Sequence, residues 1–155
     1  LGGRDRFILA KEEPDQAVRY TVQEGQGRSI VLGASGRVLL AFSNGAVASE
    51  LIEKSQLSDV EKTRLTSDLV KIRSAGFNLS ESELTRHAFA IAVPVFSQSD
   101  DLLGVLTVAG PTLEYQKEKL ADLVALLNHK SQEIMLASPI VRHMKQETKR
   151  MRDEL

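Results

Sequence analysis

The sequence predicts a mixed α+β domain in which an antiparallel sheet is covered by helices. Three observations predict this class: short strand-like segments early in the chain, helical patterns in the middle, and a strand pair followed by a long helix. The chain has 155 residues, of which 42% are apolar and 26% charged, as expected for one globular domain. We therefore expect residues 1–155 to form a single domain.

The first elements are short. Residues 6–11 and 17–22 are rich in branched and aromatic residues, and a turn-like stretch around Pro14 separates them, so they are predicted to pair as strands. A helical pattern begins after Gly33 and is expected to be followed by a second short helix over residues 46–54.

The clearest predicted helix runs from Ser58 to Ala75. Ser58 and Glu61 have the spacing of a capping box, and Gly76 can adopt the left-handed conformation that ends many helices. The residues expected to form its apolar side are Val60, Leu65, Leu69 and Ile72.

The late strand pair is the most informative pattern. Two apolar runs, residues 89–96 and 102–109, are joined by polar residues and predict a β-hairpin. A four-residue loop would pair Phe96 with Asp101 and, further along, Ala90 with Thr107. One face of the hairpin would then carry the small residues Ala90, Ala92, Thr107 and Ala109, and the other face would carry bulky residues.

The small face has two interpretations. It can form a hollow that admits a small ligand, oriented by the Thr107 hydroxyl, or it can simply let a helix pack closely. After the hairpin, a long amphipathic helical segment is predicted up to Pro139, and a final helix is predicted over residues 140–155.

Composition excludes several classes of function. The net charge of -1 gives no overall attraction to nucleic acid or to an anionic membrane, and the absence of cysteine excludes disulfides and thiolate zinc sites. No apolar run approaches the roughly 20 residues of a membrane-spanning helix, so we expect a cytoplasmic protein without a membrane partner. Because the chain begins with Leu1, we expect it to be a fragment.

Catalytic and metal-binding patterns are weak. His129 and His143 lie in predicted helices without a second ligand at metal spacing, so no metal site or cofactor is expected. Ser35 lies in a Gly-rich turn that opens a helix, and a hydrolase using this serine is a disfavoured alternative. The amides of that turn can instead hold an anion. We expect a protein that is not an enzyme.

Several motifs together carry a family resemblance. They are the segments at 36–41 (GRVLLA), 72–77 (IRSAGF), 90–96 (AIAVPVF) and 106–111 (LTVAGP), with Glu83 between the second and third. Their order and spacing resemble the C-terminal effector-binding domain of IclR-type bacterial transcriptional regulators. The resemblance implies a GAF-like fold, a homodimer or homotetramer, and DNA binding only through an N-terminal winged helix-turn-helix domain that this chain lacks. A GAF-like sensor domain of a signalling enzyme is the alternative.

The resemblance also implies where an effector binds. The matching positions in this chain are Ala34, Ser35, Ser80, Ala90, Thr107 and Ala109. Ala90, Thr107 and Ala109 also lie on the small face that strand pairing predicts. His87 has two interpretations: it can bind a carboxylate at the mouth of the pocket, or it can be a surface residue of a loop.

The chain departs from the family pattern at several positions. Ser29-Ile30-Val31 replaces the frequent Pro-Leu-His, His87 replaces a common glycine, and Ser80 and Ala90 replace acidic or thiol groups that some relatives use. The resulting pocket is less polar. We therefore expect a small organic metabolite larger or more apolar than a two- or three-carbon oxoacid, such as a carboxylate or an aromatic compound.

Overall fold

The structure, a computed structural model, describes residues 5–15 and 21–137. The predicted final helix over residues 140–155 therefore lies outside the described residues. The elements, in chain order, are β1 (Asp5–Phe7), β2 (Gly27–Ser29), α1 (Gly33–Phe42), α2 (Gly45–Glu53), α3 (Asp59–Ala75), β3 (Asn78–Glu81), β4 (Ala88–Phe96), β5 (Leu102–Pro111) and α4 (Leu120–Ala137). Two short 3-10 turns, Thr112–Glu114 and Lys117–Lys119, connect β5 to α4.

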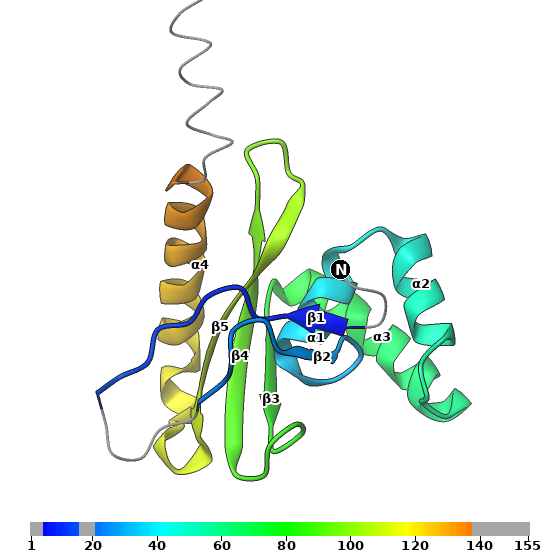
Figure 1. The fold of residues 1–155 in the computed structure, drawn as a ribbon, viewed down its shortest axis with the longest axis horizontal. Coiled ribbons are helices and arrows are strands. Elements are labelled where there is room, and N and C mark those ends of the chain that lie inside the picture. The colour runs from blue at the N-terminus through cyan, green and yellow to red at the C-terminus, as the bar shows by residue number, and fades with distance from the viewer. Residues whose placement is uncertain (1–4, 16–20, 138–155) are drawn as a thin grey trace, which may run out of the picture.

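The elements form three layers (Figure 1). The β3–β4–β5 sheet is in the middle, α4 covers one face, and α1 with α2 and α3 lies on the other side. This arrangement confirms the predicted α+β class. None of the described helices is long and apolar enough to span a membrane.

The early strand pair differs from the prediction. β1 pairs antiparallel with β2. Of the predicted partner segment 17–22, residues 17–20 lie outside the described residues, and Thr21 and Val22 are not in a strand. The pairing places Phe7 opposite Gly27, where an added Cβ would lie 3.1 Å from the Phe7 ring. Gly27 is therefore a partner that leaves room for the aromatic side chain.

The predicted helices α1, α2 and α3 are confirmed. Both halves of the predicted capping box at Ser58 and Glu61 form, and Gly76 ends α3 with a φ of 80°. The predicted apolar side of α3 is only partly correct. Leu65 and Ile72 are buried, but Val60 is 79% exposed because the first turn of α3 contributes no residue to the packed clusters.

The central sheet is antiparallel, in the order β3-β4-β5. The predicted hairpin is confirmed as β4 and β5, while β3 is an additional strand that the sequence patterns did not reveal. The predicted register was wrong: Phe96 pairs with Leu102, and a bulge between Val95 and Phe96 then makes Ala90 pair with Ala109. From Val95 back to Phe89 the pairing is shifted by two residues, and an even shift leaves these residues and their partners on the predicted faces. Leu102, on the other side of the bulge, is shifted by one and lies on the face of Phe96.

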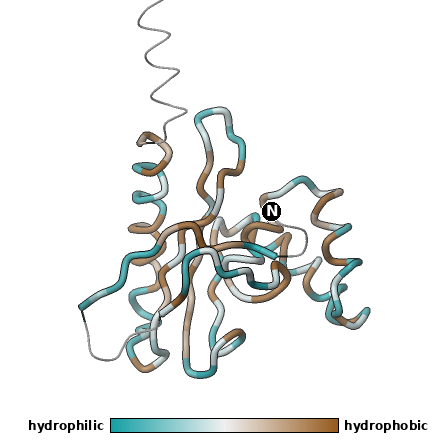
Figure 2. Tube along the Cα trace, viewed as in Figure 1, coloured by the Kyte–Doolittle hydropathy of each residue, from teal (hydrophilic) through white to brown (hydrophobic). Residues whose placement is uncertain are grey.

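The two faces of the sheet pack against different helices. On the α4 side, the large side chains Phe89, Ile91 and Val93 pack with Leu127 of α4. On the α1 side, Ala92 packs with Ala34, Val38 and Ala41 of α1 and with Ile72 of α3. Figure 2 shows the apolar character of the central strands and the hydrophilic turns at the two ends of the sheet.

Candidate functional site

The α1 side of the sheet carries two rows of cross-strand neighbours. One row is Ser80–Ala90–Ala109 and the next is Asn78–Ala92–Thr107. Ala34, in the first turn of α1, packs in the same cluster as Ala90 and Ala92, so the beginning of α1 lies over these rows. Ala92 is fully buried and Thr107 is exposed, whereas the first row is half-buried throughout. The rows are therefore covered at the centre and accessible toward β5.

Two glycines let α1 begin at this place. Gly33 has a φ of 73°, and a Cβ there would lie 2.4 Å from Leu84 Cδ1. A Cβ on Gly36 would lie 2.2 Å from the carbonyl oxygen of Ile30. A larger residue is excluded at Gly36 because its Cβ would meet backbone atoms. It is excluded at Gly33 because crowding by Leu84 is combined with a left-handed conformation.

A buried arginine supports the first turn of α1. Arg6, on β1, is only 9% exposed. Its Nε donates a hydrogen bond to Ser35 Oγ at 2.8 Å, and its Nη1 donates to the Ser29 carbonyl oxygen at 3.2 Å. The first turn of α1 contains no acidic residue and has no side-chain N-cap. The cationic guanidinium group and the positive end of the helix dipole therefore lie together at this corner of the site.

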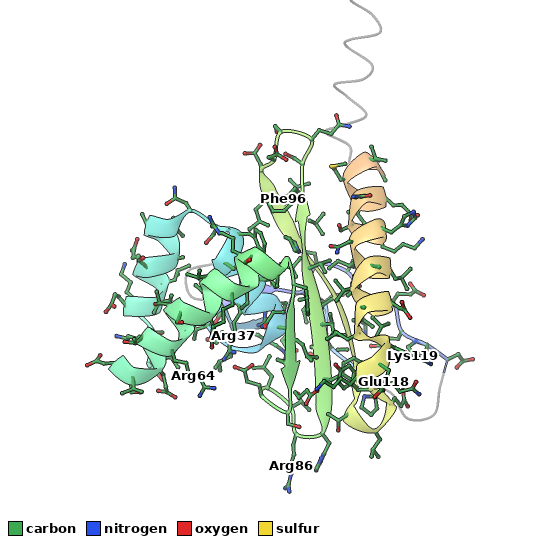
Figure 3. The ribbon with its side chains drawn as sticks, turned by 180° about the vertical axis from the view of Figure 1, so that it is seen from behind. Arg37, Arg64, Arg86, Phe96, Glu118 and Lys119 are labelled. Carbon is green, nitrogen blue, oxygen red and sulfur yellow. The ribbon has the colours of Figure 1, made fainter. Side chains whose placement is uncertain are left out.

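An ion pair ties α1 to the turn between β3 and β4. Arg37 donates from Nη2 to Glu83 Oε1, and both side chains are about three quarters buried. Figure 3 shows Arg37 directed from α1 toward the lower part of β3, whereas Arg86 points from the tip of the turn into solvent. The ion pair therefore fixes the position of the loop that brings Leu84 against Gly33.

The structure brings together most of the predicted site residues. Ser80, Ala90 and Ala109 form one row, and Ser35 lies in the α1 turn that begins over it. Ala34 is only 1% exposed and packs in the core between α1 and β4, so its side chain cannot reach solvent.

His87 lies apart from these residues. It is exposed, has a φ of 62° in the turn before β4, and its carbonyl oxygen accepts hydrogen bonds from the backbone and side chain of Thr112. This placement agrees with the interpretation of His87 as a surface loop residue.

Sequence reasoning missed two polar residues beside the site. The sequence patterns place Arg6 only in a predicted strand and predict no role for Asn78. Asn78 precedes Ser80 by two positions, and residues two apart on a strand share a face, but this rule applies only once β3 is known to be a strand. For Arg6 no local signal existed, since its contact with Ser35 spans 29 positions of the chain.

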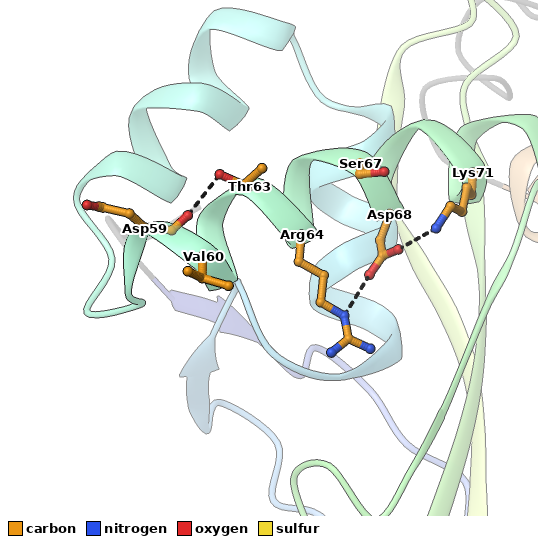
Figure 4. A pocket seen from close by; sticks show the side chains of 7 residues that line it. All are labelled: Asp59, Val60, Thr63, Arg64, Ser67, Asp68 and Lys71. Atoms are coloured by element: carbon orange, nitrogen blue, oxygen red, sulfur yellow. Dashed lines mark hydrogen bonds and ion pairs between the residues drawn. The ribbon is translucent and has the colours of Figure 1, made fainter.

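A separate groove runs along α3 (Figure 4). It measures about 580 Å³ and is lined by Asp59, Val60, Thr63, Arg64, Ser67, Asp68 and Lys71. All these residues belong to one helix, and Asp68 forms ion pairs with Arg64 and Lys71 across it. A groove with walls from a single helix does not enclose a ligand, so it is a less suitable site than the rows beneath α1. Among the described residues, no group of three or more side chains could hold a metal ion.

The sequence matches the family model described as the bacterial transcriptional regulator IclR C-terminal domain, over residues 1–136. The chain belongs to this family. Among curated relatives, it is 25% identical over 129 residues to the HTH-type transcriptional regulator BhcR of Paracoccus denitrificans, covering 79% of this chain and 46% of that protein. The IclR-type domain described here thus spans about half the length of the curated relatives that it matches.

Solved structures share the fold. Transcriptional regulator RHA06195 from Rhodococcus sp. RHA1 superposes with a TM-score of 0.81 at 20% identity, covering 87% of this chain and 58% of that one. The inducer-binding domain of PobR from Acinetobacter, a double mutant in complex with 3-hydroxybenzoic acid, superposes with a TM-score of 0.74 at 23% identity over 87% of this chain and 83% of that one.

The family match confirms the prediction of an IclR-type effector-binding domain of a transcriptional regulator. The relatives named above are transcriptional regulators, and none of the matched proteins favours the alternative, a sensor attached to a signalling enzyme.

Proposed function

We propose that this IclR-type domain binds a small organic effector on the α1 side of the sheet, between the first turn of α1 and the row Ser80–Ala90–Ala109. The observation that carries the proposal is the convergence of the Arg6–Ser35 hydrogen bond and this half-buried row at the beginning of α1. Few positions on a sheet combine small apolar residues with directed polar groups, and that combination is typical of ligand sites.

The corner formed by Arg6 and the beginning of α1 favours an acidic effector. Arg6 is held in place by Ser35 and by the Ser29 carbonyl, so its guanidinium group does not need to be ordered when a carboxylate arrives. A planar guanidinium suits bidentate carboxylate binding. The alanines beside it leave room for an apolar body, so the proposed effector is a carboxylate with an aromatic or similarly apolar group.

Effector binding would act on the rest of the regulator by shifting a conformational equilibrium. The ligand must bind two states of the domain with different affinities, because equal affinity shifts no population. α1 is the element that contacts the proposed ligand and the packed core together. We propose that its position is transmitted to a DNA-binding domain preceding this one, within a homodimer or homotetramer. In this proposal, DNA contact comes from that domain, and the present domain is a sensor rather than an enzyme.

A thermal-shift experiment with defined acids tests the proposal. The probes are 3-hydroxybenzoate, chosen because the fold is shared with the PobR domain, and the oxoacids glyoxylate and pyruvate. We expect 3-hydroxybenzoate to raise the melting temperature of the wild type. A response restricted to the two oxoacids would contradict the proposed size class, and no response to any probe would contradict the site.

The variant Thr107→Leu localises the response. Thr107 is exposed at the open end of the rows, so a leucine there should leave stability within about 0.5 kcal/mol of wild type while abolishing the shift with 3-hydroxybenzoate. Thr66→Leu, at an exposed position of α3, is the matched control and should keep the full shift. An unchanged response in Thr107→Leu would place the ligand elsewhere.

A further inference from the structure

Asn78 stands out among the polar residues of the sheet because part of its side chain is buried without a partner. It is the first residue of β3, and its side-chain Nδ2 has no hydrogen-bond partner although it is inaccessible to solvent. A buried amide that makes no hydrogen bond is costly, and such groups in native proteins have a specific explanation.

The position of Asn78 connects it to the proposed effector site. Strand pairing places it in the row with Ala92 and Thr107, next to the row of Ser80. Ala92 packs against α1, so the Asn78 side chain projects from the same face of the sheet. The Asn78 side chain therefore lies on the face of the sheet that α1 covers.

Other buried polar atoms without a partner are of a different kind. Arg37 Nε belongs to a side chain that is already held by its ion pair with Glu83, and Arg28 Nε belongs to a side chain whose Nη2 donates a hydrogen bond to Gln26 Oε1. The Tyr115 hydroxyl belongs to a ring that packs against Phe89, on the α4 side of the sheet. An asparagine side chain is too short to extend its amide to solvent as a longer side chain can, so an acceptor for Asn78 Nδ2 must be brought to it.

We infer that Asn78 is a specificity-determining residue that donates a hydrogen bond from Nδ2 to an oxygen of the bound effector. This inference rests on the proposed function and deepens it. The effector then carries two oxygen-bearing groups: an acidic group near Arg6 and Ser35, and a second acceptor, such as a hydroxyl or carbonyl oxygen, on the β3 side. An analogue without the second oxygen leaves the Asn78 amide unpaired and is bound more weakly.

The variant Asn78→Leu separates a ligand-binding role from a structural one. Leucine has a similar volume and removes the unpaired donor, so we expect the ligand-free protein to melt about 3 °C higher than wild type. The same variant should bind 3-hydroxybenzoate about tenfold more weakly, measured by calorimetric titration. Benzoate, which lacks the second oxygen, should bind wild type and variant equally.

Two further variants complete the test. Asn78→Ala covers the case in which leucine does not fit, and it should weaken 3-hydroxybenzoate binding by the same factor. Asn128→Leu, at an exposed position of α4, is the matched control. It should change neither the melting temperature of the ligand-free protein nor its affinity for 3-hydroxybenzoate. A lower melting temperature of both Asn78 variants would overturn the inference, because it would assign the amide a structural hydrogen bond.

The remaining outcomes distinguish this inference from the proposed function. If wild type binds 3-hydroxybenzoate and both Asn78 variants bind it equally well, only the inference fails. If wild type binds neither 3-hydroxybenzoate nor the two oxoacids, the proposed function fails, and the inference fails with it.

Discussion

The two faces of the β3–β4–β5 sheet are made by the same strands but carry side chains of different size and polarity. On the α4 side, Ile91 and Val93 are fully buried and pack with Phe89 and Leu127 into a continuous apolar cluster. On the α1 side, the corresponding positions hold alanines, a serine and a threonine, and two of the buried polar groups discussed above border them.

In the proposed function, one face of the sheet stabilises the fold and the other binds the effector. The bulky residues beneath α4 pack with Leu127 into one apolar cluster, so we regard α4 as a fixed support of the sheet. The small residues beneath α1 each contribute less apolar surface, and in the proposed function they form the floor of the effector site. We expect substitutions on the two faces to have opposite consequences: loss of stability on one, and loss of binding on the other.

The largest effect is expected on the α4 side. Ile91→Ala deletes a side chain that is 0% exposed and should destabilise the protein by about 3 kcal/mol, because it removes buried surface and leaves a cavity. Urea denaturation measures the change. A loss below about 1 kcal/mol would show that the α4 face is not the main support and would break the comparison.

On the α1 side, we expect a substitution to change stability less but to abolish effector binding. Ala90→Val adds two methyl groups to a half-buried position in a strand, where a β-branched residue is well tolerated, so stability should change by at most about 1 kcal/mol. The thermal shift with 3-hydroxybenzoate should disappear because the added bulk fills the proposed site. If Ala90→Val retains the thermal shift, Ala90 does not line the site, and the proposed binding role of the α1 face is contradicted.

The smallest effect lies far from both faces, at the capping box of α3. The hydroxyl and backbone amide of Ser58 donate hydrogen bonds to the Glu61 carboxylate and lower its pKa below the ordinary 4.5. A lowered pKa in the folded state means that the stabilisation is present above pH 4.5 and is lost as the pH falls through the folded-state value. At pH 7 the wild type should therefore have a slightly higher melting temperature than Glu61→Gln, and this difference in melting temperature should vanish in acid.

The same charge change in a Ser58→Ala background is the control for this prediction. With the hydroxyl donor removed, replacing Glu61 by glutamine should produce a smaller difference in melting temperature at neutral pH. A difference that persists at low pH would exclude the carboxylate as its source. Neither variant should alter the response to 3-hydroxybenzoate.

Much of the fold was predictable because its signals are local. The capping box at Ser58, the helix end at Gly76 and the two apolar runs that form β4 and β5 each depend on residues close in sequence. β3 was missed because a four-residue strand with polar residues has no such signal. The hairpin register was wrong because the bulge beside Phe96 follows from packing and has no sequence signature.

The candidate site was predictable only in part. The small residues at positions 90, 107 and 109 could be assigned to one face because an even register error does not exchange faces. The polar residues could not be placed in the same way. Arg6 reaches Ser35 only after β1 and β2 have paired beside α1, and Asn78 joins the face only through its pairing with β4.

The sequence by itself therefore determined the family, the α+β class, the helix boundaries around α3 and the existence of a small-residue face, since all of these follow from periodicity, capping and motif spacing. Only the tertiary structure decided which helix covers that face, which polar groups lie beside it and which amide remains unpaired. The physical reason is that hydrogen bonds and packing between distant segments depend on the relative positions of whole elements, and no short stretch of sequence encodes those positions.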